Sequence, residues 1–413
     1  MTNNSPEGWK EESLGNMVAI QGGIAAPNED IGEGEIPFIR MKDLGNYHMT
    51  TNFIKTEGFI KRDYVEKNRI PISRKGTIII PRSGSVNLNH RAVLGTDCVI
   101  VSHICALSPN ESVNNLFLYY VLCNYDMTRI MSRTTGLNMI KFSDLEKLKF
   151  KIPKSIKEQQ KIAAILQNVD NAIEKTKELI EKCKKMKQGL MHDLFTNSVD
   201  EQGVQYSQTK EHSLFGKMPD HWREGLMRDI CDVSQGLQIA ITERKTRPGR
   251  NRYVYITIQY LNAEDKVKSA EFVENPPKSV ICSEEDVLMT RTGNTGQVIT
   301  GYSGVFHNNF FIVKYDKSKV TKKYLVYYLQ RPEIRNLMTS LAGLTTIPDL
   351  KHADFLNMPM IYPEDLNEQE RIAQILGNIE NRIQSEQNYL DKLTKIKKGL
   401  MQDLLTGKVR VAA

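Results

Sequence analysis

Two stretches of this sequence decide its fold. They are EQQKIAAIL at Glu158–Leu166, which returns as EQERIAQIL at Glu368–Leu376, and KMKQGLMHDLFT at Lys185–Thr196, which returns as KIKKGLMQDLLT at Lys395–Thr406. Positions 158–196 align with 368–406 without a gap, and 18 of these 39 positions are identical. Unrelated sequences would match at roughly one position in fifteen. The chain therefore contains a tandem duplication.

Both repeated segments have the pattern of a long amphipathic helix. Apolar residues recur at steps of three and four, from Ile162 to Leu194 in the first copy and from Ile372 to Leu404 in the second, and neither copy contains proline. At 1.5 Å per residue, a helix over these positions would be roughly 58 Å long. Because such an apolar stripe must be covered, we expect the two helices to pack side by side as an antiparallel coiled coil with pseudo-twofold symmetry.

The segments before the helices repeat more loosely. SPEGW at Ser5–Trp9 corresponds to MPDHW at Met218–Trp222, and GTIIIPRSG at Gly76–Gly84 corresponds to DVLMTRTG at Asp286–Gly293. Short β-branched runs bounded by Gly, Asn and Ser predict strands, and Lys322–Met338 has a helical pattern. The fold class is therefore α/β (α+β), with two similar mixed domains. We predict recognition domain 1 at 1–155, helix 1 at 156–197, a linker at 198–211, recognition domain 2 at 212–365, helix 2 at 366–407 and a tail at 408–413.

The bulk properties fit this division. A chain of 413 residues is too long for one hydrophobic core and fits two domains plus connections. A net charge of +7 is compatible with a polyanionic partner but does not establish one. No run approaches 18 apolar residues, and the polar N-terminus lacks the apolar stretch of a signal peptide. We therefore expect a cytoplasmic protein whose six scattered cysteines are free, mostly buried thiols.

Polar loops after the repeated strand are the first candidates for contacts with DNA. Their Arg, Asn, Gln, Ser and Thr side chains can bind base edges and phosphates, although an ordinary capped turn would use the same residues. A second pair of loops follows in each half. The predicted DNA-binding residues are Arg82, Ser83, Ser85, Asn87, Asn89, Arg91, Asn138 and Lys141 in the first half, and Arg291, Thr292, Asn294, Thr295, Gln297, Thr345, Thr346 and Lys351 in the second.

Two groups of basic residues are ambiguous. Lys182–Lys187 on the first helix could touch phosphate, but a solvated helix face is the better interpretation. The cluster of Lys245, Arg247, Arg250 and Arg252 has no counterpart in the first half. It is either a phosphate-binding loop or a solvated insertion.

The similarity of the helix ends in both copies exceeds what a spacer requires. We therefore expect them to bind two copies of one partner. The predicted partner-binding residues are Gln159, Ile162, Leu166, Gln369, Ile372 and Leu376.

No catalytic or metal site is predicted. Asn275-Pro276-Pro277 matches part of a loop used by amino-methyltransferases, but Lys278 stands where the base-stacking aromatic residue belongs. Glu264-Asp265-Lys266 resembles half of a nuclease site without a supporting acidic residue. The sequence contains no P-loop, no HExxH and no Ser or Cys nucleophile motif.

The order of variable domain, repeated helix, variable domain and repeated helix resembles the specificity subunit of Type I restriction–modification enzymes. The residues that carry the resemblance are EQQKIAAIL, KQGLMHDL, EQERIAQIL and GLMQDLLTGKVR, with PEGW and PDHW opening the domains. The resemblance covers essentially the whole chain. It implies that each domain reads one half of a split, asymmetric site on double-stranded DNA.

The resemblance also implies partners. The helices would set the spacing and dock two methyltransferase subunits, which restriction/translocase subunits would join. S-adenosylmethionine, Mg²⁺ and ATP would then belong to those partners, and none to this chain. An alternative from the residues alone is a non-catalytic, two-headed protein-interaction scaffold. Steep loss of duplex binding at rising salt would favour the DNA-binding interpretation.

Overall fold

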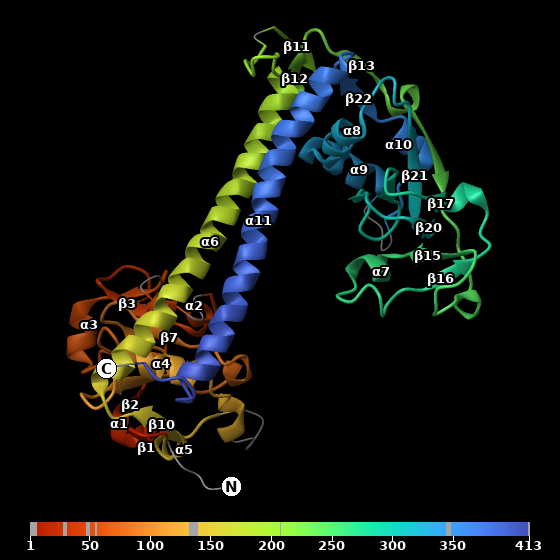
Figure 1. The fold of residues 1–413 in the computed structure, drawn as a ribbon. Coiled ribbons are helices and arrows are strands. Elements are labelled where there is room, and N and C mark those ends of the chain that lie inside the picture. Colours follow the sequence, from red (N-terminus) through yellow and green to blue (C-terminus); the bar gives the residue numbers. More distant parts are fainter. Residues whose placement is uncertain are drawn as a thin grey trace. The chain divides into compact units, whose positions relative to one another are not determined.

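The computed structural model describes residues 6–27, 31–46, 50–53, 56–131, 139–206, 208–343 and 348–411. The chain forms two compact units (Figure 1). Unit 1 comprises Met1–Glu178 and Gln387–Ala413, and unit 2 comprises Leu179–Glu386. Each unit holds one recognition domain together with one half of α6 (Ile156–Asn197) and one half of α11 (Leu366–Leu404).

Recognition domain 1 is a mixed α/β domain of short elements. In chain order they are β1 (Trp9–Ser13), α1 (Leu14–Met17), β2 (Val18–Gly22), β3 (Ile36–Ile39), α2 (Met41–Asn46), β4 (Thr50–Phe53), β5 (Phe59–Ile60), α3 (Arg62–Lys67), β6 (Ile78–Pro81), η1 (Ser85–Leu88), β7 (Ala92–Leu94), β8 (Val99–Ile100), β9 (Ile104–Pro109), α4 (Asn115–Cys123), η2 (Met127–Ile130), α5 (Phe142–Glu146) and β10 (Lys149–Pro153). They form a five-stranded sheet of order β2-β9-β6-β7-β4, a three-stranded sheet of order β5-β3-β8 and the pair β1-β10.

Recognition domain 2 repeats this frame. Its elements are β11 (Thr209–His212), β12 (Gly216–Pro219), β13 (Arg223–Leu226), η3 (Met227–Asp229), β14 (Cys231–Gln235), η4 (Ile241–Glu243), β15 (Arg252–Ile256), α7 (Ile258–Asn262), β16 (Phe272–Glu274), η5 (Lys278–Val280), β17 (Ile281–Cys282), β18 (Val287–Thr290), β19 (Val298–Ile299), β20 (Gly304–Phe306), β21 (Phe310–Tyr315), α8 (Lys322–Gln330), α9 (Pro332–Ala342), α10 (His352–Leu356) and β22 (Pro359–Tyr362). The order β14-β21-β18-β19 corresponds to β2-β9-β6-β7, and the pair β13-β22 corresponds to β1-β10. The mixed α/β class predicted from the sequence is confirmed.

One predicted helix is broken in two. The pattern at Lys322–Met338 predicts a continuous helix, but α8 ends at Gln330 and α9 begins at Pro332. Proline lacks the backbone N–H that would continue a helix, whereas the first helical position needs no such donor. The chain turns at Arg331, and α9 starts in a new direction.

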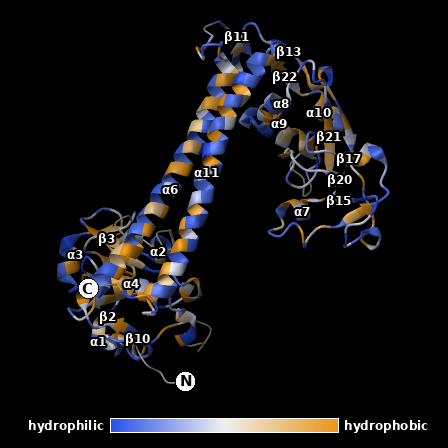
Figure 2. Cartoon of the chain, in the orientation of Figure 1, coloured by the Kyte–Doolittle hydropathy of each residue, from blue (hydrophilic) through white to orange (hydrophobic). Residues whose placement is uncertain are grey.

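Each domain core receives the ends of both long helices. In unit 1, Ile162 and Leu166 at the start of α6 pack in one core with Leu404 at the end of α11. In unit 2, the start of α11 packs in the same way with Leu194 and Phe195 at the end of α6. Figure 2 shows both helices as alternating hydrophobic and hydrophilic bands. The apolar residues at the helix ends are therefore used to attach the helices to the domains.

The two helices run antiparallel within each unit, and the same polar contact holds them twice. In unit 2, Lys187 of α6 forms an ion pair with Glu380 of α11, and Tyr327 of α8 donates a hydrogen bond to the same carboxylate at 2.7 Å. In unit 1, Lys397 Nζ lies 2.6 Å from Asp170, which accepts a hydrogen bond from the Tyr120 hydroxyl at 2.9 Å. The antiparallel pairing predicted from the apolar stripe is confirmed in both units.

All six cysteines are free, and all but Cys123 are buried. Within the described residues, no helix is long and apolar enough to cross a bilayer. Among the same residues, no group of three or more His, Cys, Asp or Glu side chains is placed to hold a metal ion.

Candidate nucleic-acid interface

The loop after β18 is a tightly bonded hairpin loop that presents two amides. The Thr290 N–H donates to the Gln297 carbonyl and the Gly296 N–H to the Thr290 carbonyl, both at 2.9 Å, and the Thr290 Oγ1 accepts from the Gln297 N–H at 2.8 Å. Gly293 and Gly296 have φ values of +81° and +80°, in the left-handed region that favours glycine. Asn294 and Gln297 are exposed, and their side chains lie 3.3 Å apart (Nδ2 to Oε1). The backbone bonds fix two amides of the kind that bind adenine edges.

Arg291 at the start of this loop has a structural role. Its Nε and Nη2 donate to the two carboxylate oxygens of Asp349 at 2.6 and 2.8 Å. This bidentate pair raises the pKa of Arg291 and lowers that of Asp349. Thr292 bridges to Asp349 through the backbone, and the Thr295 Oγ1 donates to the Arg291 carbonyl at 3.2 Å. Arg291 and Thr295 are therefore engaged within unit 2, by Asp349 and by the Arg291 carbonyl, and their contact with DNA stays a prediction.

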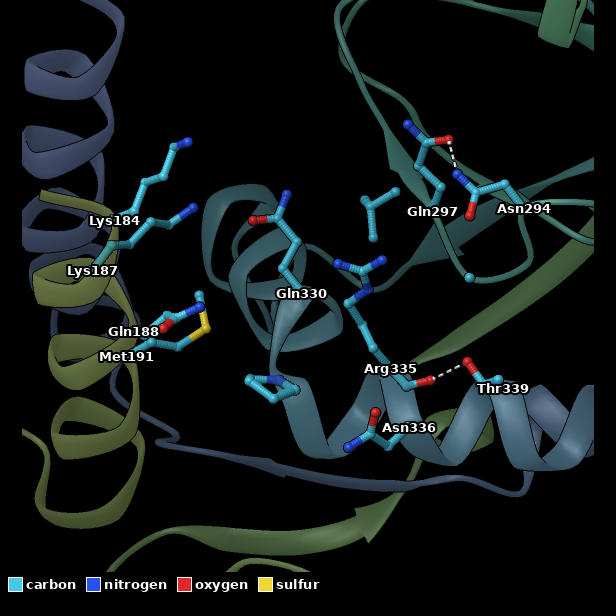
Figure 3. Close-up of a pocket in the computed structure, with 13 residues that line it drawn as sticks. Lys184, Lys187, Gln188, Met191, Asn294, Gln297, Gln330, Arg335, Asn336 and Thr339 are labelled. Atoms are coloured by element: carbon cyan, nitrogen blue, oxygen red, sulfur yellow. Dashed lines mark hydrogen bonds between the residues drawn. The ribbon is translucent and has the colours of Figure 1, made fainter. Parts of the chain in front are cut away.

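The two amides open onto a polar cleft of about 700 Å³ (Figure 3). All of the lining residues belong to unit 2. They are Lys184, Lys187, Gln188 and Met191 of α6, Asn294, Gly296, Gln297 and Val298 at the loop and β19, and Gln330, Pro332, Arg335, Asn336 and Thr339 of α8 and α9. The lining contains three basic side chains and no carboxylate, so the cleft suits a polar anion.

The three basic groups are not equivalent. Lys187 is held by Glu380 and lies 5.6 Å from the centre of the Tyr327 ring. Lys184 pairs with Glu181 at 2.7 Å, but both side chains are more than half exposed. Arg335 is exposed and, among the described residues, has no side-chain partner. Figure 3 shows Lys184 and Lys187 extending from α6 and Arg335 from α9, with Asn294 and Gln297 on the facing loop. Lys184 and Arg335 are the cations available to a ligand.

The corresponding loop in unit 1 is also internally bonded. The Ser83 Oγ lies 2.7 Å from His103 Nδ1, and the Arg82 guanidinium stacks 4.5 Å from the centre of the Phe142 ring. Asn89 has a φ of +51° and donates to Asp126 at 3.0 Å. These side chains form part of the loop's own structure.

Arg91 is the clearest departure from the predicted DNA contacts. It is 2% exposed and donates to the Tyr125 carbonyl at 2.5 Å and to the Asn89 side chain at 3.1 Å. Burial lowers its pKa. The predicted DNA contacts at Asn89 and Arg91 are therefore corrected, since these residues join η1 to the segment around η2.

Other predicted positions fall into two groups. Lys141 and Lys351 are exposed and stand at equivalent places, immediately before α5 and α10. Asn138, Thr345 and Thr346 lie outside the described residues, as do the side chains of Ser85 and Asn87. In the basic insertion, Lys245 and Arg252 both lie within 4.0 Å of Glu274, while Arg247 and Arg250 are exposed.

The six residues predicted to bind a partner are buried inside the chain. Ile162, Leu166, Ile372 and Leu376 are 0% exposed, and so are Gln159 and Gln369. The Gln159 Oε1 accepts from the Asn114 N–H and the Gln369 Oε1 from the Thr321 N–H, both at 2.7 Å. Asn114 and Thr321 are the N-caps of α4 and α8. The predicted partner surface is corrected, because these side chains attach each long helix to its own domain.

Sequence reasoning missed Gln330, Arg335 and Asn336. Treating residues 322–338 as one helix concealed the turn that brings α9 to the cleft. Pro332 was the available signal, since proline favours the first position of a helix.

The chain is similar to known proteins over nearly its whole length. The family model described as "Type I restriction modification DNA specificity domain" matches residues 6–185 and again residues 219–395. The chain is similar to the Type I restriction enzyme MjaVIII specificity subunit of Methanocaldococcus jannaschii, with 24% identity over 98% of this chain and 94% of the relative. The putative MjaX specificity subunit of that organism shows 24% identity over 98% and 95%.

Solved structures show the same fold. The S subunit of a Type I restriction–modification system from M. genitalium aligns with a TM-score of 0.62 at 18% identity, over 98% of this chain and 97% of that chain. A chain from a structure of complex assembly in the type I R-M system aligns with a TM-score of 0.56 at 14% identity, over 98% and 100%.

Proposed function

The chain belongs to the Type I restriction–modification DNA specificity family, and we propose that each of its recognition domains binds one half of a split, asymmetric site on duplex DNA. It is the specificity subunit of such a system, a recognition component and not an enzyme. The observation that supports the proposal best is the internally hydrogen-bonded loop after β18, whose two exposed amides open onto a cleft with no carboxylate in its lining.

In that loop, different residues bind bases and maintain the structure of the loop. Asn and Gln amides can donate and accept at one base edge, and adenine presents the complementary pair in the major groove. Asn294 and Gln297 are exposed and supported by bonded backbone, so little ordering is needed on binding. Arg291, by contrast, is engaged by Asp349. The amides are therefore the base-contacting groups in domain 2.

The test is methylation-site mapping of the assembled system with Asn294→Ala/Gln297→Ala. We expect altered preference in one half-site and an unchanged second half-site and spacer. Asn381→Ala, which removes an exposed amide from α11 away from the cleft, is the matched control. Identical methylated sites for the loop variant and the control would refute the role of the two amides.

The exposed faces of the long helices support docking of two copies of one partner. Met186 in unit 2 and Ile396 in unit 1 occupy equivalent positions and are 48% and 50% exposed. Gly189 and Gly399 lie one turn further along, and a Cβ at either position would meet nothing within 4 Å. Glycine inside a helix costs about 1 kcal/mol relative to alanine, and packing within this chain does not explain why glycine occurs at these two positions. The close approach of another chain at both positions would explain it. We propose that this other chain is the methyltransferase subunit.

Leucine at these glycines separates docking from folding. Gly189→Leu and Gly399→Leu should raise the stability of the helix and weaken methyltransferase binding, each at one of two sites. Sedimentation or native mass measurement of the reconstituted complex should give one bound subunit for each single variant. Two bound subunits in both variants would exclude this face as the docking surface.

α6 and α11 are continuous over 42 and 39 residues, which suits a spacer between half-sites. Inserting one helical turn in both should change the spacer while leaving the half-sites as they are. S-adenosylmethionine, Mg²⁺ and ATP are assigned to the methyltransferase and restriction/translocase partners.

A further inference from the structure

We infer that helix α6 is itself part of the DNA-binding surface of unit 2, where Lys184 on α6 and Arg335 on α9 hold the phosphodiester backbone beside the amides of the 294–297 loop. This inference rests on the proposed DNA-binding function and adds the helix to it. In this arrangement α6 and α9 bind phosphates, and the 294–297 loop contacts bases.

The lining chemistry matches a DNA backbone. Phosphate oxygens are bound in proteins by Arg and Lys together with Asn, Gln and Thr side chains. The cleft provides Lys184 and Arg335 with Gln188, Gln330, Asn336 and Thr339, and its lining contains no carboxylate. The cleft has a volume of about 700 Å³ and lies open to solvent beside the 294–297 loop.

The simplest alternative for Lys184 is a solvated helix face. Its ion pair with Glu181 is exposed at both ends, and such pairs hold their partners weakly. Lys187, one turn further along, is already bound to Glu380 and serves the helix pairing. Of the lysines on this part of α6, Lys182 and Lys185 do not line the cleft. Lys184 is thus the lysine that both reaches the cleft and can change partner.

The duplication provides independent support, because it distinguishes two faces of the same helix. Lys185 and Gly189 are identical to their counterparts in α11, as expected of a face that binds two copies of one partner. Of the four cleft-lining positions on α6, two differ, since Lys184 corresponds to Thr394 and Gln188 to Lys398. The other two, Lys187 and Met191, are identical to their counterparts, and they serve the helix pairing and the core. Two half-sites of different shape place their phosphates differently and so require different contacts, whereas two identical subunits do not. The divergence therefore fits a surface that faces DNA.

The test uses the full chain and a fluorescein-labelled duplex of random sequence, with binding measured by anisotropy from about 50 to 200 mM salt. For each lost phosphate contact, the slope of log K against log salt should fall by about 0.9. Lys184→Gln and Arg335→Gln should each show this change, and the double variant should lose nearly twice as much. Lys182→Gln is the matched control, an exposed lysine on the same helix that does not line the cleft.

The outcomes are separable from those of the proposed function. A slope for Lys184→Gln equal to that for Lys182→Gln would overturn the role of α6, even if the Asn294/Gln297 variant still changes the half-site. A reduced slope with an unchanged half-site preference would support it, because phosphate contacts carry no direct base information. Thermal unfolding checks that each variant remains folded. If Lys184→Gln unfolds early, it is replaced by Lys184→Thr, because threonine is the residue at the equivalent position in α11.

Discussion

Replacing Gln369 by leucine tests whether the repeated EQ pair attaches a helix to its domain or binds a partner. Gln369 is 0% exposed, and its Oε1 accepts the Thr321 N–H at 2.7 Å. Its Nε2 donates to the carbonyls of Lys319 and Pro363 at 2.7 and 2.9 Å. Leucine keeps the volume of this side chain and removes all three bonds.

The expected loss follows from the groups left without partners. A buried N–H that loses its acceptor costs about 1–3 kcal/mol, and the two carbonyls add to this. The buried leucine recovers part of the loss through its apolar area. We expect unit 2 to be destabilised by about 2–4 kcal/mol, or roughly 4–16 °C for a unit of this size. Gln159→Leu should do the same in unit 1, because Gln159 holds Asn114 and Pro153 in the corresponding way.

The two tryptophans make the assay specific to each unit. Trp9 lies in unit 1 and Trp222 in unit 2, and they are 4% and 2% exposed. In a Trp9→Phe background, the emission of Trp222 alone reports the unfolding of unit 2. Glu370→Leu is the control, since Glu370 is the exposed neighbour of Gln369 on the same helix.

A different result would restore the partner interpretation. If Gln369→Leu unfolds with the same Trp222 midpoint as Glu370→Leu but loses the methyltransferase subunit, the buried bonds contribute little and the side chain binds outward. If stability falls and the folded variant still binds the subunit at low temperature, the attachment role is established.

Further predictions concern groups in both units. Burial lowers the pKa of His352, so its neutral form contributes stability that is present above the unfolded pKa of about 6.5 and lost as pH falls toward the folded pKa; His352→Gln should flatten the pH dependence of the Trp222 midpoint in that range. Arg291→Gln and Asp349→Asn should each destabilise unit 2 by up to about 1 kcal/mol, discounted because both groups are partly exposed. In a double-mutant cycle their effects should be less than additive, with the half-site unchanged. Tyr327→Phe and Tyr120→Phe should each cost about 1 kcal/mol, and only in their own unit, as measured by Trp222 and Trp9 emission.

The long helices could be predicted from the sequence because their signals are local. The 3.6-residue apolar period and the absence of proline place a helix over 156–197, and α6 spans Ile156–Asn197. The frame of the domains was predictable for the same reason, since short β-branched runs such as Val287–Thr290 form strands. The continuous helix predicted at 322–338 was wrong, because the chain leaves the helical conformation at Arg331 and Pro332, which lacks the N–H needed to continue α8, begins α9.

The candidate site was less predictable because its contacts join distant parts of the chain. Arg291 has the composition of a base-reading residue, but its partner Asp349 lies 58 positions away. Arg91 is buried and donates a hydrogen bond to the carbonyl of Tyr125, which lies 34 positions away. No local pattern distinguishes an arginine that bonds within the fold from one that is available to DNA. Arg335 could not be assigned until the break after α8 placed it beside α6.

An identical residue in the two helices therefore indicates a shared function only when its burial is considered as well. Gln159 and Gln369 are identical because each satisfies the N-cap of a domain helix, and their identity implies no partner. Glu158 and Glu368 are also identical and buried, but their partners differ. Glu158 accepts two hydrogen bonds from Arg410, whereas Glu368 accepts from the Trp222 indole N–H at 2.7 Å and from the Ser198 hydroxyl, and lies 3.0 Å from His221 Nε2. In those cases the fold explains the identity.

Gly189 and Gly399 differ from the buried pairs because nothing within the described residues approaches their Cα carbons on the side where a Cβ would stand. An identity that the fold does not require, at a position where glycine weakens the helix, calls for a contact from outside the chain. Positions that line the cleft and differ between copies, such as Lys184 and Thr394, call for the opposite explanation. Two results together would refute this reasoning: the leucine variants still bind both methyltransferase subunits, and Lys184→Gln binds random duplex with the same salt slope as Lys182→Gln. In that case, exposure and identity between the copies would not distinguish partner-binding residues from DNA-binding residues on α6.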